Sequence, residues 1–457
     1  MSTLGSLLAP ARYLSRAEAE ALARRALATA TAEATRVSLQ SGTRGNTRFA
    51  VNQISTAGDN FNTTITVRSL FGKKSANVTT NKLDDEGLRY AVETSERLAK
   101  LAPDDPEEMG ELGPQQYEES RGWSDATAAL EPTGRASAVR AITEATRAAG
   151  LDGTGYLETN AGSFAVANSK GLFAYARGTG TALTTTVRTR DGTGSGWAGA
   201  AHHDFSRLEP ASLGTRAIEK ARLSTNPVAV EPGRYTVILE PTAVANLLQL
   251  VGFALNARSA DEGRSFFSKP GGGNKIGMKI VDERVTIVSD PLDPEAPANT
   301  FTGEGLPTKR TVWVENGVVR NLSYDRYWAQ KSGREPVPFV GSIRMNGGNA
   351  SIEQMIASTP RGILVTRFWY IRSVDPRTIL YTGLTRDGTF LIENGKITKA
   401  IKNLRFNESP IFMLNNLEAM GTPMRVSASE SGSPGLAIVV PPIKVRDFTF
   451  TSLSDAV

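Results

Sequence analysis

The alternation of apolar and polar residues predicts a first half that mixes helices with strands. Ser15-Arg16-Ala17-Glu18 has the pattern of a capping box, and the Ala- and Leu-rich segment after it predicts a helix to about Thr35. A second helix is expected from Asp84 or Asp85 to about Leu101, because apolar residues recur there at helical spacing. Between the two helices we expect strands at Thr47–Ser55, Thr63–Phe71 and Lys74–Thr80.

Further along the chain, the same pattern predicts two helices and two sets of short strands. They lie at Arg135–Ala149 and Pro210–Leu223 (helices), and at Gly155–Ser169 and Ala182–Arg190 (strands). Turn-forming residues at Asn226-Pro227 and Glu231-Pro232-Gly233 then favour a domain boundary. We therefore expect one domain over residues 1–228 and a second over residues 229–457.

Strands dominate the second half. Asn-Gly flanked by alternating apolar residues predicts two hairpins, Val312–Val319 and Phe390–Ile397, because both turn positions need positive φ. Further elements are expected at Gly362–Arg372, Thr378–Thr382 and Leu436–Val440 (strands) and at about Pro410–Met420 (helix). The fold class predicted is α+β, an N-terminal α/β domain followed by a β-rich C-terminal domain.

One strand–helix junction is of the kind at which an enzyme would place its reactive side chains. The strand Tyr235–Glu240 runs into a helix that Thr242 can cap and that continues to about Ala257. The helix carries no His, Cys, Asp or Glu. Its apolar residues predict a helix buried nearly all round, with a core of Val244, Leu247, Leu248, Val251, Phe253 and Leu255.

Composition narrows the classes of function. The net charge is only +5, from 52 basic and 47 acidic residues, and the Lys and Arg residues are scattered, which argues against direct nucleic-acid binding. The chain has no Cys, which excludes disulfides and thiolate metal sites. No apolar run reaches the roughly 18 residues that span a bilayer, and the N-terminus lacks the basic region of a signal peptide. We expect a cytoplasmic protein with no membrane partner.

Four local motifs give weaker signals. Residues 102–120 are acidic and contain no Lys or Arg, which predicts a solvated crossing loop rather than paired catalytic carboxylates. Gly194–Gly199 matches G-x-G-x-x-G but opens no apolar helix, so we expect a flexible glycine loop. The adjacent His202 and His203 cannot readily grip one metal, and exposed loop histidines are expected. Arg386 and Asp387, before Gly388, could contact a ligand or simply form a turn.

In the order and spacing of its segments, the chain resembles the TldD/PmbA family, also called the modulator of DNA gyrase family. The similarity runs over nearly the whole length. It is carried by RFAVNQIS, VTTNKLDDEGLRYAVETSERLAKLA, GLFAYARGTGTALTTTVRT and GSGWAGAA in the first half, and by EPGRYTVILEPTAVANLL, KIVDERVTIVSDP, GEGLPTKRTVWVENGVV and FWYIRSVDPRTILYTGLTRDGTFLIENGKI in the second.

The resemblance implies which of the family's two kinds of subunit this is. The TldD type resembles a zinc metallopeptidase with a His-Glu-x-x-x-His helix and a distant Cys. When that motif is aligned with this sequence, Gln249 and Ala254 stand at the His positions and Leu250 stands at the Glu position. The Cys position lies near Arg386. The resemblance therefore implies a PmbA/TldE-like subunit that is not active alone and binds no metal or cofactor, with zinc expected in a TldD-like partner.

What the resemblance further implies is a heteromeric protease that processes or degrades small unfolded peptides inside a chamber. Arg386 and Asp387 are then candidates for chamber or peptide contact, and the link to gyrase is indirect. Two other functions stay open: a stand-alone, metal-independent hydrolase, and a DNA- or gyrase-associated modulator. The first would use carboxylates such as Asp261, Glu262, Asp290 or Glu304. A homodimer through the same surface is also open.

Overall fold

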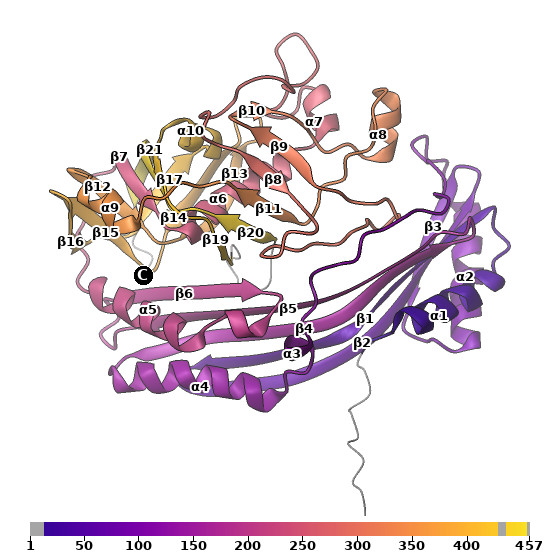
Figure 1. The fold of residues 1–457 in the computed structure, drawn as a ribbon, viewed down its shortest axis with the longest axis horizontal. Helices are drawn as coiled ribbons and strands as arrows, with labels where there is room; N and C mark the ends of the chain where they lie inside the picture. The colour runs from indigo at the N-terminus through magenta and orange to yellow at the C-terminus, as the bar shows by residue number, and fades with distance from the viewer. Residues whose placement is uncertain (1–12, 428–435, 455–457) are drawn as a thin grey trace, which may run out of the picture.

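A long, curved antiparallel sheet forms the first half of the protein (Figure 1). The computed structural model describes residues 13–427 and 436–454; most of the N-terminal stretch from which we expect no signal peptide lies outside them. The strand order is β3-β2-β1-β4-β5-β6. The strands are β1 (Ala34–Ala50), β2 (Gln53–Phe71), β3 (Lys74–Thr80), β4 (Asp152–Asn168), β5 (Phe173–Arg188) and β6 (Ser195–His202).

Helices cover one face of this sheet, and the second half of the chain lies over the other face (Figure 1). The helices are α1 (Arg16–Ala28), α2 (Asp85–Leu101), α4 (Pro132–Ala148) and α5 (Pro210–Leu223), with short turns α3 (Asp125–Ala128) and η1 (Phe205–Arg207). The capping box at Ser15 and the Asp84 cap of α2 are both confirmed. Two apolar clusters result, one under α1 and α2 and one under α4 and α5.

Three of the secondary-structure assignments predicted for this half were wrong. The first helix ends at Ala28, because residues from Ala34 onward pair with β2 and β4. The predicted strand Thr47–Ser55 is interrupted by a tight turn at Val51-Asn52, where both φ angles are positive. The predicted glycine loop Gly194–Gly199 mostly belongs to strand β6, where its lack of side chains lets α5 pack close: a Cβ at Gly196 would lie 2.2 Å from the Ala217 carbonyl oxygen.

Two sheets form the second half. One has the order β10-β9-β8-β11-β20-β19, and the other β13-β14-β17-β21-β7-β12-β15-β16, with β18 beside β21. Their strands are β7 (Gly233–Leu239), β8 (Ile287–Ser289), β9 (Thr311–Glu315), β10 (Val318–Val319), β11 (Ser342–Met345), β12 (Arg361–Val365), β13 (Phe368–Asp375), β14 (Leu380–Thr385), β15 (Thr389–Glu393), β16 (Lys396–Ala400), β17 (Leu404–Glu408), β18 (Leu417–Met420), β19 (Met424–Val426), β20 (Ala437–Val440) and β21 (Ile443–Leu453).

The helix α6 (Pro241–Ala254) packs between these two sheets, in one apolar cluster with residues of both. The shorter helices are α7 (Ala257–Asp261), α8 (Arg326–Lys331), α9 (Ile352–Ala357) and α10 (Pro410–Asn415). Both Asn-Gly hairpins are confirmed, with positive φ at both residues of each turn. The predicted helix to Met420 ends earlier, since Leu417–Met420 pairs with β21 instead. The α+β class with a β-rich second half is confirmed.

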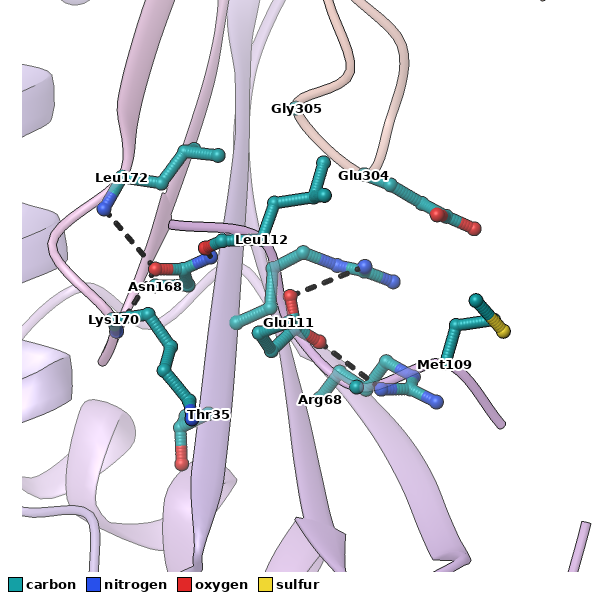
Figure 2. Close-up of polar contacts among 12 residues, drawn as sticks. Thr35, Arg68, Met109, Glu111, Leu112, Asn168, Lys170, Leu172, Glu304 and Gly305 are labelled. Carbon is teal, nitrogen blue, oxygen red and sulfur yellow. Dashed lines mark hydrogen bonds and ion pairs between the residues drawn. The ribbon is translucent and has the colours of Figure 1, made fainter. Parts of the chain in front are cut away.

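The acidic segment 102–120, here called the acidic strap, is a crossing loop as predicted, but only part of it is solvated. The Glu111 side chain is 1% exposed and pairs with Arg36 of the first sheet at 3.4 Å. It also pairs with Arg68 of the same sheet at 3.1 Å (Figure 2). On its other side, Glu107 accepts two 2.7 Å hydrogen bonds from Arg258 of α7. The strap therefore joins the two halves through ion pairs, which the run of acidic residues alone did not indicate. Among the described residues, no helix is long and apolar enough to cross a bilayer.

Candidate functional site

The junction between β7 and α6 is the centre of the candidate site. Helix α6 begins at Pro241, so the predicted cap Thr242 lies inside the first turn and Glu240 occupies the capping position. The Glu240 side chain makes no cap bond; its carboxylate instead binds Lys220 Nζ of α5 at 2.6 Å. This ion pair attaches the start of α6 to the helical layer of the first half.

The three positions that the resemblance aligns with a zinc helix are half-buried on α6. Gln249 donates a hydrogen bond from Nε2 to the Asn246 carbonyl oxygen at 3.2 Å, while Leu250 and Ala254 pack against the apolar cluster. One amide and two hydrocarbon side chains do not fit a zinc ion, which prefers imidazole, thiolate and carboxylate ligands. Within the described residues, no three His, Cys, Asp or Glu side chains gather closely enough to hold a metal.

Helix α6 is less completely buried than its sequence predicted. Val244, Leu247 and Leu248 are fully buried, but Phe253 is 62% exposed. The C-terminal end of the helix therefore emerges from the core with an aromatic side chain facing outward. The expectation that Phe253 belongs to the core was wrong.

The turn that carries Arg386 and Asp387 approaches α6 through two intervening residues. The Arg386 backbone N–H donates to the Arg367 carbonyl oxygen at 3.2 Å, and the next residue, Phe368, donates its N–H to Asn246 Oδ1 of α6 at 3.1 Å. The fold thus brings this turn close to Asn246 of α6 from about 140 residues away in sequence.

Asp387 also connects the two halves of the chain. Its side chain is buried, accepts a 2.6 Å hydrogen bond from Ser195 Oγ of β6 and lies 3.7 Å from the Arg367 guanidinium. Arg367 in turn stacks over Trp197 of β6 at 4.6 Å from the ring centre. Asp387 and Ser195 line a cavity of about 510 Å³ between the halves. Contact of Arg386 or Asp387 with a peptide stays a prediction.

The carboxylates considered for a metal-independent hydrolase each have a structural partner. Asp261 accepts hydrogen bonds from Asn274 and from the Trp328 indole, both at 2.7 Å. Glu262 is paired with the two arginines beside it, and Glu304 lies 3.3 Å from Arg326. Asp290 accepts from a backbone N–H two residues on, which is the geometry of a turn. The fold does not gather these four residues into one site.

The two histidines are not the exposed loop residues that we expected. His202 ends strand β6 and is buried, and its Nδ1 accepts the Asp204 backbone N–H at 2.9 Å. Burial, reinforced by the nearby Arg425, lowers the pKa of His202 to about 4 and also lowers the pKa of His203. A buried imidazole in this setting is neutral at physiological pH, because protonation would break the bond to Asp204.

A large polar cavity opens between the first sheet and the second half. Its volume is about 1020 Å³, and strands β1, β2, β4 and β5 form one wall, opposite the loops 298–303 and 339–341. Asn60, Asn160 and Arg177 line the wall, and Phe301 and Phe339 line the opposite side. Sequence reasoning missed this site. The lining residues follow one another along the strands, as at residues 40–44, 160–164 and 176–179, and show no alternation with apolar residues that could have marked the site.

Three family models match most of the chain. They are described as PmbA/TldA metallopeptidase domain 1 (residues 36–99), central domain (125–225) and C-terminal domain (232–452). The chain belongs to the PmbA/TldD family. This confirms the resemblance that the sequence motifs indicated.

Known relatives agree with this assignment. A metalloprotease of Methanothermobacter thermautotrophicus is 25% identical over 53% of this chain and 56% of its own length, and a TldD homolog of Buchnera aphidicola is 24% identical over 46% and 45%. The chain thus matches about half the length of these relatives. The crystal structure of TldE from Thermococcus kodakarensis superposes with a TM-score of 0.81 at 20% identity, covering 95% of this chain and all of that one. At this identity, the likeness shows the shared fold.

Proposed function

We propose that this chain is a non-catalytic, TldE/PmbA-like subunit that pairs with a TldD-like zinc metallopeptidase. One observation carries the proposal. The chain belongs to a metallopeptidase family, yet residues 249, 250 and 254 of α6 are Gln, Leu and Ala. The helix keeps its place between the two sheets, yet it offers neither zinc ligands nor a general base. Zinc and the general base are supplied by the partner subunit in this proposal.

The polar cavity supports a role in handling peptides. A wall of amide, hydroxyl and backbone groups can bind an extended peptide backbone without reading its side chains, which suits small unfolded substrates of varied sequence. At about 1020 Å³ the cavity can hold several residues of a peptide. In the proposed complex this cavity forms part of the chamber around the partner's zinc, and the complex works in the cytoplasm.

The proposal is tested by purifying the chain alone and together with the TldD-type subunit encoded in the same genome. The isolated chain should bind no stoichiometric zinc by metal analysis and cleave no unstructured peptide. The co-purified complex should contain zinc and hydrolyse the peptide, and replacing the partner's zinc-helix Glu with Gln should abolish hydrolysis. Zinc-dependent hydrolysis by the isolated chain would sink the proposal, as would failure of the two chains to associate.

A DNA- or gyrase-associated modulator is the weaker alternative. It predicts DNA affinity that falls steeply with salt, because each neutralised phosphate releases a counterion. The basic residues of the strap region are already paired with carboxylates, as in Arg68 with Glu108 and Arg258 with Glu107. No observation on the described residues favours this function over the peptidase subunit.

A further inference from the structure

The outer edge of strand β2 carries a long segment without a pairing partner. Strand β1 pairs with β2 from Gln53 to Leu70, but on the other side β3 pairs only with Ile65–Phe71. Within residues 13–427 and 436–454, no strand pairs with the outer edge of residues 53–64. All ten residues from 53 to 62, here called the open edge, are exposed. This stretch of strand is therefore stabilised by little burial of its own side chains.

The open edge lacks the devices by which proteins usually protect such strands. Lys, Pro and short length discourage a second chain from pairing with an edge. Edge strand β16 carries Lys396 and Lys399, and the short β3 begins at Lys74. The open edge contains no Lys, Arg or Pro, and its one charge, Asp59, is held by Arg135 at 2.5 Å. Ile54 and Phe61 within it are 44% and 55% exposed.

The open edge is also the rim of the polar cavity. Asn60 and Asn62 line the cavity, as does Thr64 just beyond them. A strand added to this edge would continue the curved sheet, and with it the cavity wall. An unprotected edge at this rim therefore fits a partner that completes the chamber.

The size of the open edge favours a folded subunit over a short peptide as its occupant. In an antiparallel pair, alternate residues direct both N–H and C=O outward, so ten residues offer about ten hydrogen bonds. Each of these bonds adds little net free energy, because both groups give up a bond to water when they pair. Association also costs translational, rotational and side-chain freedom. Edge pairing alone is therefore marginal, and a stable occupant must bring further contacts.

We infer that the open edge pairs with an extended strand of the TldD-type subunit, so that the first sheet continues across the subunit interface. The inference rests on the proposed function and specifies where the partner binds. The chemistry of the edge calls for a partner strand that offers apolar side chains to Ile54 and Phe61 and places no carboxylate against Asp59. The other possible occupants are a second copy of this chain and a substrate peptide.

Hydrogen exchange on the native complex is the first test. The outward amides of residues 53–62 should exchange at least about tenfold more slowly in the complex than in the isolated chain, because a paired edge amide opens only with its neighbours. Amides of β3, at residues 74–80, should be unchanged. A complex that forms and cleaves peptide but leaves exchange at 53–62 unchanged overturns this inference and leaves the proposed function standing. Failure to form any complex overturns both.

The absence of native Cys permits a second, site-specific test. Ala57→Cys places a single thiol in the open edge, and Asn77→Cys places a matched thiol on the exposed surface of β3. After labelling with a benzophenone maleimide, light should cross-link the TldD-type subunit to residue 57 and not to residue 77. Equal cross-linking from both positions contradicts the assignment. Cross-linking only to a second copy of this chain, or protection by substrate peptide without the partner, also overturns it.

A charge substitution tests the open edge through the affinity of the complex. Ala57→Lys imitates the protection found on β16 and should weaken the complex at least about tenfold, while Asn77→Lys should leave its affinity unchanged. Thermal unfolding of each isolated variant verifies that it is folded. If Ala57→Lys does not fold, the exchange experiment on the unmodified chains still decides the matter.

Discussion

Replacement of Glu111 by Gln tests whether the acidic strap is a structural element. The Glu111 carboxylate is almost fully buried and lies between two arginines, each with a side chain only 16% exposed (Figure 2). Removing its charge leaves Arg36 without this partner and weakens the hold on Arg68. Removal of one partner from a buried ion pair costs about 3–5 kcal/mol.

The expected cost here is smaller, about 2 kcal/mol, for three reasons. Gln keeps one acceptor oxygen, Arg68 keeps its contacts with Glu108 and Ser75, and both guanidinium groups retain some access to water. A loss of about 2 kcal/mol is a large share of the 5–15 kcal/mol that stabilises a typical domain. It corresponds to an approximately 30-fold change in the folding equilibrium.

Guanidinium unfolding measures this loss as a lower midpoint at unchanged slope. Glu119→Gln is the matched control, because Glu119 lies in the same strap but is exposed; its effect should stay within about 0.5 kcal/mol. Limited proteolysis should cleave the Glu111→Gln strap faster than the native one. An effect of Glu111→Gln no larger than that of Glu119→Gln would refute the argument that buried ion pairs join the halves here.

Three further predictions concern the candidate site and its surroundings. Because the pKa of His202 is about 4 in the folded protein and near 6.5 in the unfolded chain, the free energy of unfolding should fall by up to about 3 kcal/mol as the pH drops from 6.5 to 4. Urea titrations should show a weaker pH dependence for His202→Gln, and the same pH dependence in both proteins would contradict the assignment. Asp387→Ala should lower stability by about 2 kcal/mol, since it removes the buried carboxylate that accepts from Ser195 Oγ and faces the Arg367 guanidinium. A change in midpoint no larger than that of an exposed Asp would count against it. The triple variant Gln249→His, Leu250→Glu, Ala254→His should fold yet show no zinc peptidase activity when assayed with added zinc; activity would show that a third ligand is unnecessary.

The elements that sequence predicted well are those with local causes. Helices α2 and α5 begin at a cap or a proline and end where the apolar spacing ends, and both Asn-Gly turns need no tertiary information. The misplaced elements depend on distant partners. The first helix stops because Ala34 and the residues after it pair with strands of the sheet, and the burial of Glu111 depends on arginines 43 and 75 residues away.

The candidate site was predictable only where a motif could be laid on the sequence. The resemblance placed Gln249, Leu250 and Ala254 on one helix and Arg386 on a distant turn, and the fold brings both near Arg367 and Phe368. The polar cavity and the open edge of β2 carry no comparable motif. They arise from the curvature of a six-stranded sheet and from the difference in length between β2 and β3, which period-2 alternation does not encode.

The packing of α6 explains how this helix can lack zinc ligands at residues 249, 250 and 254 without losing its place in the fold. Residues 249, 250 and 254 are half-buried, whereas the intervening Val251 and Gly252 are pressed into the core: a Cβ at Gly252 would lie 2.5 Å from Ile343 Cδ1. Polar side chains at residues 249, 250 and 254 would keep some contact with water, so substitutions there should disturb the core less than substitutions at Val251 or Gly252. The absence of zinc ligands at these three positions follows from the side chains and not from the position of the helix. In the proposed complex, this chain keeps the scaffold's stability while the reaction depends on the partner.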